Sequence, residues 1–171
     1  MRFFSFDAET DGLYGEPFAV AAVVMDEEGR ILDRFCEKCE EPGVRDAWTR
    51  ENCLPWLADI PKCESRAALR ERFWQFYRKH RESCVIVADV PYPVEAGLLR
   101  SCVETDPGER RGEGPFPLID VASVLFARGI DPLADRFEYS GWTGKQHHPM
   151  DDAVASCLCL IRAMREKERG E

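Results

Sequence analysis

Two acidic residues near the amino terminus have the spacing of a metal site. Asp7 and Glu9 lie two positions apart in residues 2–9, which alternate in the manner of a β-strand. Both carboxylates therefore project from one face of the strand, opposite Phe4 and Phe6. Two like charges placed side by side require a cation, and hard oxygen ligands favour Mg²⁺ or Mn²⁺. An isolated pair of this kind could equally be a solvated strand edge.

The residues that follow make the metal site the more specific interpretation. Residues 7–13 read Asp-Ala-Glu-Thr-Asp-Gly-Leu and resemble the first motif, D-x-E-T-T-G-L, of the DEDD 3′→5′ exonucleases, which they match at positions 7, 9, 10, 12 and 13. The third motif of the histidine-bearing branch is a His followed five residues later by Asp-Ala, and His147 and Asp152 occupy those places. The two motifs stand in the family's order, near the two ends of the chain.

Either of two adjacent histidines could belong to this third motif. If the last helix began before His148, that residue and Asp152 would form an i, i+4 pair on one helical face. Pro149 argues against such a start, because proline prefers the first helical turn and disfavours helical conformation in the residue before it. We therefore assign the catalytic role to His147, in a loop for which the glycines of residues 141–144 could supply a hinge.

The second motif departs from the family pattern. Family members usually have an Asn, an Asp four or five residues later that opens a helix, and a Leu four residues beyond it. Counting back from Leu99 places Glu95 where that Asp belongs and Asp89 near the place of the Asn. We expect Glu95 to be the fourth acid and keep Asp89 as the alternative. The helix dipole also favours a carboxylate in the first helical turn, which would give Glu95 a purely structural role.

The resemblance implies a phosphodiesterase that uses two Mg²⁺ or Mn²⁺ ions. The metal ligands that it implies are carboxylates: Asp7, Glu9, Asp152 and Glu95, with Asp89 as the alternative to Glu95. One ion would lower the pKa of a water whose proton His147 takes, and the other would stabilise the leaving 3′ oxygen. The residues implied to hold the last nucleotide are Thr10, Gly12 and Leu13. The expected function is 3′→5′ exonucleolytic hydrolysis at the 3′ end of single-stranded DNA or RNA.

Two other functions are compatible with the altered second motif. The chain could be a catalytically degenerate member of the family that binds nucleotide ends or a protein partner without cutting. It could also be a metal phosphoesterase that acts on small nucleotides rather than on polymers.

Other chemistry-bearing residues have simpler interpretations. A structural zinc site could be built from four of the eight cysteines: Cys36, Cys39, Cys53 and Cys63. Their spacing is irregular, and we expect the cysteines to be reduced thiols, because the chain shows no sign of export. Asp151 is expected to be a solvated acid at the start of the last helix.

The elements that position these residues can be read from hydrophobic periodicity and turn residues. Strands are expected over residues 2–9, 18–25, 31–36 and 84–88, and helices over 44–57, 65–82, 94–103 and 151–167. Residues 118–121 could be a short strand or the entry to a helix that ends near 127, with Asp120 as its cap. Residues 105–117 and 131–150 are expected to be irregular. This order predicts an α/β protein, and the resemblance implies a ribonuclease H-like fold with a mixed central sheet flanked by helices.

Length and charge limit the remaining possibilities. A chain of 171 residues is expected to form one domain over residues 1–171. Its 23 basic and 32 acidic side chains give a net charge of −9, which disfavours extended binding to duplex DNA. No apolar run approaches the ~20 residues of a transmembrane helix, so we expect no membrane association and a cytoplasmic location.

The oligomeric state stays open at this level. Trp48, Trp56 and Trp142 could lie in the core or at the interface of a homodimer.

Overall fold

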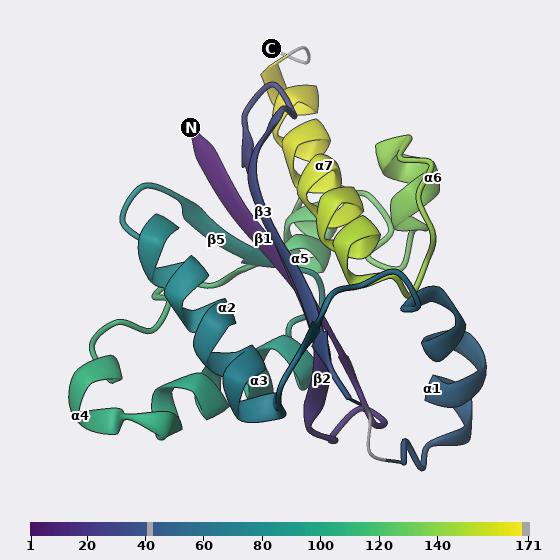
Figure 1. Cartoon of the computed structure of the whole chain (residues 1–171). Coiled ribbons are helices and arrows are strands. Elements are labelled where there is room, and N and C mark those ends of the chain that lie inside the picture. Colours follow the sequence, from purple (N-terminus) through teal and green to yellow (C-terminus); the bar gives the residue numbers. More distant parts are fainter. Residues whose placement is uncertain (41–42, 169–171) are drawn as a thin grey trace.

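A computed structural model describes residues 1–40 and 43–168 of the chain (Figure 1). Within this part, six strands form one mixed sheet in the order β4-β3-β2-β1-β5-β6. Their bounds are β1 (Arg2–Thr10), β2 (Pro17–Asp26), β3 (Ile31–Cys39), β4 (Lys62–Cys63), β5 (Val85–Ala88) and β6 (Ile119–Asp120). β1 is antiparallel to β2 and parallel to β5, which in turn is parallel to β6. The α/β class with a mixed central sheet is confirmed.

Helices cover both faces of this sheet (Figure 1). Their bounds are α1 (Ala47–Asn52), the short 3₁₀ helix η1 (Leu54–Trp56), α2 (Arg66–His80), α3 (Val94–Thr105), α4 (Pro107–Arg110), α5 (Val121–Ala127), α6 (Arg136–Ser140) and α7 (Pro149–Glu168). α2 and α3 pack on one face, and α5 and α7 pack on the other. No helix in the described residues is both long enough and apolar enough to span a bilayer.

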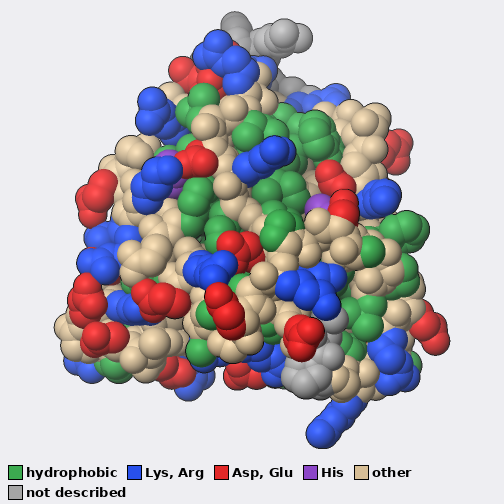
Figure 2. All heavy atoms as spheres, viewed as in Figure 1, with side chains coloured by type: hydrophobic (Ala, Val, Ile, Leu, Met, Phe, Trp, Pro, Cys, Tyr) green, Lys and Arg blue, Asp and Glu red, His purple; other side chains and the backbone are tan. Residues whose placement is uncertain are grey.

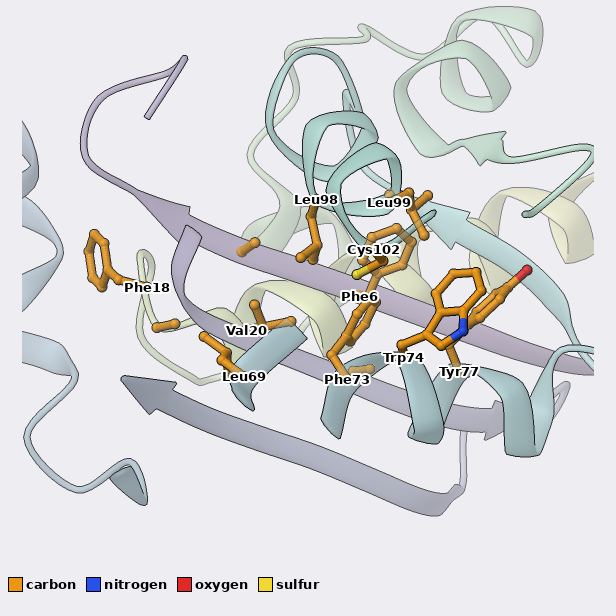
Figure 3. Close-up of a cluster of buried hydrophobic side chains, with 14 of the residues drawn as sticks. Phe6, Phe18, Val20, Leu69, Phe73, Trp74, Tyr77, Leu98, Leu99 and Cys102 are labelled. Atoms are coloured by element: carbon orange, nitrogen blue, oxygen red, sulfur yellow. The ribbon is translucent and has the colours of Figure 1, made fainter. Parts of the chain in front are cut away.

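An aromatic core fills the space between the sheet and α2 and α3 (Figure 3). Phe6 of β1 packs against Phe73 of α2, with ring centroids 5.5 Å apart. α2 buries one stripe because Leu69, Phe73 and Tyr77 recur at helical spacing. The Ser65 side chain accepts a hydrogen bond from the Ala68 amide, so the expected cap of this helix is confirmed. This packing fixes β1 from one side.

α7 holds β1 from the other face. Val154, Cys157 and Ile161 of α7 share a buried cluster with Phe3 of β1 and Val23 of β2. The helix begins two residues earlier than expected, at Pro149, a residue type suited to the first helical position. The first turn of α7 therefore lies against the last part of β1, which carries Asp7 and Glu9.

Short elements account for the differences from the sequence-based prediction. The helix expected over 44–57 is reduced to α1, capped by Asp46, followed by η1. α4 lies inside the expected loop 105–117, and α6 lies inside the expected irregular stretch 131–150. Each is a single turn started by an aspartate cap, too short to show helical periodicity.

The topology gathers chain segments at one edge of the sheet. β1, β5 and β6 run parallel, so their carboxyl ends at Thr10, Ala88 and Asp120 lie along the same edge. β1 is also where the sheet changes from parallel to antiparallel neighbours. Open α/β sheets place their ligands outside the carboxyl ends of strands at such a switch point.

Candidate active site

Three carboxylates meet at the end of β1. Asp7 and Glu9 come from the strand and Asp152 from the first turn of α7, and one ligand oxygen of each lies within 4.8 Å of the others. The packing of α7 on β1 brings these residues together across about 145 positions of sequence. The geometry suits a cation held by hard oxygen ligands.

Glu95 lies beside the same strand. It stands in the first turn of α3 and is only 5% exposed. Its charge acts on the pKa of Asp7, and a backbone hydrogen bond from Ala8 reaches its carboxylate. Glu95 is therefore placed along β1 between the two acids of the first motif.

Asp89 has a partner of its own. The Arg136 side chain donates from Nε and Nη2 to the two Asp89 carboxylate oxygens, at 2.8 and 3.0 Å. This bidentate pair joins the end of β5 to α6 and compensates the Asp89 charge.

Burial raises the pKa of every acid in the cluster. It brings the pKa of Glu9 to about 7 and the pKa values of Glu95 and Asp152 to about 8, and it lifts the pKa of Asp7 well above its usual range. Repulsion by neighbouring carboxylates is a further cause included in the raised pKa of Asp7, Glu95 and Asp152. Buried carboxylates that repel one another are stabilised by a bound cation, so this donor set fits a divalent metal.

His147 occupies the loop before α7, as expected. Its φ of 63° is unusual for a residue with a side chain, and Pro149 starts the helix two residues later. A ring nitrogen of His147 lies within 4.8 Å of a Glu9 oxygen and of the Cys53 sulfur. Trp48 contacts the imidazole edge to face, with centroids 4.9 Å apart. Burial lowers the pKa of His147, which keeps the ring neutral near pH 7 and able to accept a proton.

His148 takes a structural position instead. Its carbonyl oxygen accepts the Asp152 amide at 3.0 Å, as the last residue before α7. Its Nδ1 lies 3.6 Å from an Asp151 oxygen, and His148 belongs to neither of the groups in the described residues that could hold a metal.

Asp151 is not the solvated acid that we expected. Its side chain is 21% exposed and accepts hydrogen bonds from Trp142 Nε1 and the Lys145 amide, both at 3.0 Å. A Cβ atom at Gly144 would lie 2.3 Å from this carboxylate, so a larger residue there would displace the Asp151 side chain. The expected hinge is thus a loop that Asp151 ties to the start of α7, next to His147.

A pocket of about 390 Å³ opens beside Glu9. The three expected substrate-binding residues line it: Thr10, Gly12 and Leu13. Gly12 has a φ of +72°, a conformation that favours glycine, and its amide donates to the Thr49 hydroxyl at 3.2 Å. The pocket is large enough for a nucleoside.

The far wall of this pocket was not anticipated. It consists of residues from the α1 segment: Asp46, Trp48, Thr49 and Cys53. Asp11, which stands where the family motif has a second Thr, accepts hydrogen bonds from the Arg45 and Asp46 amides at 2.9 and 2.8 Å. Asp46 in turn accepts from the Thr49 amide and hydroxyl. An aspartate three residues before a threonine is a helix-cap pattern that the sequence shows. The hydrogen bond from the Asp46 amide to Asp11, 35 residues away, has no such sequence pattern.

The structure does not bring the four candidate zinc cysteines together in one group. Among the described residues, the groups that could hold a metal include Cys53, with Glu9 and His147, but none of the other three candidates. Cys39 and Cys63 are buried neighbours on β3 and β4. All eight cysteines are free thiols.

No family model and no curated protein matches the chain. The sheet order, the helices on both faces and the likeness to solved structures define a ribonuclease H-like fold, as expected. One solved structure with this likeness is the zinc ion bound form of E. coli ExoI in complex with single-stranded DNA, with a TM-score of 0.62 and 14% identity. The match covers 97% of this chain and 41% of the ExoI chain, so the chain spans less than half of that protein.

Proposed function

We propose that the chain is a divalent-metal-dependent 3′→5′ exonuclease of the histidine-bearing DEDD type, acting on single-stranded DNA or RNA. The observation that carries the proposal is the group of buried and half-buried acids at the end of β1, with His147 beside it and a nucleoside-sized pocket next to Glu9. The fold similarity to ExoI, whose structure is a complex with single-stranded DNA, supports the same class.

Four acids would hold the metal ions: Asp7, Glu9, Asp152 and Glu95. Glu95 is preferred to Asp89 because Arg136 already compensates the Asp89 charge. Divalent ions bound at such a site activate a water and stabilise the leaving oxygen of a phosphodiester. His147, neutral near pH 7, accepts the proton of the attacking water.

The pocket beside Glu9 would orient the terminal nucleotide. Thr10, Gly12 and Leu13 form its near wall, and the Trp48 ring lies 54% exposed on its far wall, available for contact with a base. A second hollow of about 430 Å³ shares Leu13 and Val94 with the first. Its rim carries the exposed rings of Tyr14 and Tyr92, so the preceding nucleotide could stack there.

The surface favours a short grip on the substrate. On the face shown in Figure 2, basic and acidic side chains are interspersed, without a broad basic area. Several arginines are engaged in ion pairs: Arg70–Glu16, Arg72–Glu64, Arg78–Glu109, Arg100–Glu104 and Arg110–Glu71. Affinity would then depend on the metal ions and the pockets rather than on many phosphate contacts.

The test uses single-stranded oligonucleotides of DNA and of RNA, labelled at the 5′ end or at the 3′ end, with Mn²⁺. A 3′→5′ exonuclease turns the 5′ label into a descending ladder and releases the 3′ label at once as a mononucleotide. Asp7→Asn should abolish both, whereas Glu51→Gln, an exposed acid on α1, should behave as the wild type.

Three outcomes would contradict the proposal. Equal traces from wild type and Asp7→Asn, with Mn²⁺ bound to the wild type, would indicate a degenerate binding protein. Early release of the 5′ label as a mononucleotide would show degradation in the 5′→3′ direction instead. Hydrolysis of a nucleotide ester with no shortening of a dinucleotide would indicate a phosphoesterase for small nucleotides.

A further inference from the structure

Cys53 lies next to the acid cluster and has no part in the proposed hydrolysis. It is 1% exposed and follows α1, where its amide donates to the Thr49 carbonyl at 3.0 Å. Its sulfur, a Glu9 carboxylate oxygen and a His147 ring nitrogen all lie within 4.8 Å of one another. Three separate elements thus bring three different donor types to one point: the end of β1, the end of α1 and the loop before α7.

This second donor set differs in chemistry from the first. Asp7, Glu9 and Asp152 offer only oxygen, whereas Cys53 and His147 offer sulfur and nitrogen. Thiolate and imidazole ligands suit zinc and other softer metals, whereas carboxylates suit magnesium or manganese. Three protein ligands with one open position are an arrangement that Zn²⁺ accepts.

The distances are close to those of a bound ion. Zinc bonds of roughly 2.0–2.3 Å place the ligand atoms of a tetrahedral site about 3–4 Å apart. Atoms that already lie within 4.8 Å of one another reach this separation by small side-chain rotations. Trp48, packed edge to face against His147, holds the imidazole on this side of the site.

The geometry points to a Zn²⁺ site formed by Cys53, His147 and Glu9. While Zn²⁺ occupies this site, the protein cannot carry out the proposed hydrolysis. On binding, the Cys53 thiol releases its proton to solvent and the thiolate bonds to the ion. Occupancy removes His147 as the base and removes Glu9 from the oxygen ligand set, since Glu9 belongs to both sets. Zn²⁺ is therefore an inhibitor that competes with Mg²⁺ or Mn²⁺. The inhibition rests on the proposed function, whereas the binding does not.

The binding test uses Co²⁺ as a spectroscopic substitute for Zn²⁺, without Mg²⁺ or Mn²⁺ and with a phosphine reductant. The wild type should develop a thiolate-to-cobalt charge-transfer band and the strong visible absorption of tetrahedral Co²⁺, both lost when Zn²⁺ is added. Cys53→Ser should lose the charge-transfer band. Cys84→Ser should keep it, because Cys84 is a partly buried thiol just before β5, at the opposite end of that strand from the acids.

A second variant guards against misfolding of Cys53→Ser. His147→Ala changes a loop residue, keeps the thiol and should weaken Co²⁺ binding by about tenfold or more, since even outer-shell changes cost that much. The binding proposal is overturned if the wild type shows only the weak spectrum of an all-oxygen site. It is also overturned if the band persists in a folded Cys53→Ser, or if His147→Ala binds Co²⁺ as tightly as the wild type.

The inhibition is measured as a ratio within each variant. In Mg²⁺, near-stoichiometric Zn²⁺ should slow the wild type by about tenfold or more, relative to its own zinc-free rate, and Cys53→Ser should lose most of this effect. Equal slowing of both proteins would overturn the inhibitory role. If neither cleaves at all, the proposed function fails, and the Co²⁺ spectra still decide whether the site exists.

Discussion

Glu95 and Asp89 are neighbouring acids whose surroundings predict different effects of mutation, on activity for Glu95 and on stability for Asp89. Glu95 is buried beside β1, and no basic side chain is among the main causes of its raised pKa. Asp89, in contrast, is paired with Arg136. We expect Glu95→Gln to reduce oligonucleotide cleavage by on the order of 10²-fold, as a lost group in the reacting centre does. Asp89→Asn should retain most of the activity and lose about 2 kcal/mol of unfolding free energy, because it weakens a charge-assisted pair.

Single-turnover cleavage rates and urea unfolding at one pH distinguish these two effects. If Asp89→Asn abolished cleavage while Glu95→Gln remained active, the assignment of the fourth acid would be reversed.

The raised pKa values of the acids also predict how stability depends on pH. The folded pKa values of about 7 for Glu9 and about 8 for Glu95 and Asp152 exceed the ordinary values of 4.5 for Glu and 3.8 for Asp. Between these limits the folded metal-free protein binds more protons than the unfolded chain, so its stability decreases as pH rises. In EDTA, the unfolding temperature should fall by about 5 °C or more from pH 5 to pH 8.5.

Mn²⁺ should reverse this trend, because it binds the deprotonated acids and stabilises most at high pH. Thermal unfolding monitored by circular dichroism, with and without Mn²⁺, measures both effects. Glu95→Gln serves as the control, because removing one titrating acid should make the fall shallower. A metal-free protein that became more stable toward pH 8.5 would contradict the prediction.

At the scale of elements, the loop before α7 depends on Asp151. Its carboxylate accepts from Trp142 and from the Lys145 amide, and this holds the segment that leads to His147. The Asn in Asp151→Asn has only one acceptor oxygen, so it can keep only one of these two bonds. Its NH₂ group would then face the other N–H donor without an acceptor between them. We expect kcat to fall by about tenfold with little change in KM, since misplacing a catalytic group weakens the transition state more than substrate binding.

The control for this variant is Asp106→Asn, which changes the cap of α4, at the opposite end of α3 from Glu95. Asn caps a helix as well as Asp, so its activity should equal that of the wild type. A steady-state comparison in which Asp151→Asn matched Asp106→Asn would show that the loop does not position His147.

The long elements could be predicted from the sequence, because each carries several turns or pleats of periodic hydrophobic residues. β1, α2 and α7 are of this kind, and two of them bear the motif residues Asp7, Glu9 and Asp152. The α1 segment could not be predicted as the wall of the pocket, since its position depends on hydrogen bonds to Asp11, distant in sequence. The role of Asp151 was missed because its partners lie in an irregular loop, where no period indicates contact.

At the scale of the whole molecule, charge limits how the chain can hold nucleic acid. The net charge of −9 and the arginines engaged in ion pairs weaken the attraction of the protein for phosphates. We expect weak binding to duplex DNA. The affinity for a single strand should fall only gently with salt, with a slope of about 1–2 in a plot of the logarithm of the binding constant against the logarithm of the salt concentration. Fluorescence anisotropy with Ca²⁺ in place of Mg²⁺ measures both, with the metal-free protein as control. Tight metal-free retention of duplex at physiological salt would contradict this picture.

The link between Asp11 and the α1 segment also has a consequence for local opening of the protein. The amides of Arg45 and Asp46 are bonded to the Asp11 carboxylate, and the Gly12 amide is bonded to the Thr49 hydroxyl. These protons can exchange with solvent only when the two walls of the pocket separate. The three amides should therefore share one protection factor, which rises when a nucleoside monophosphate fills the pocket, so that hydrogen exchange reports the opening of the pocket without any assay of cleavage.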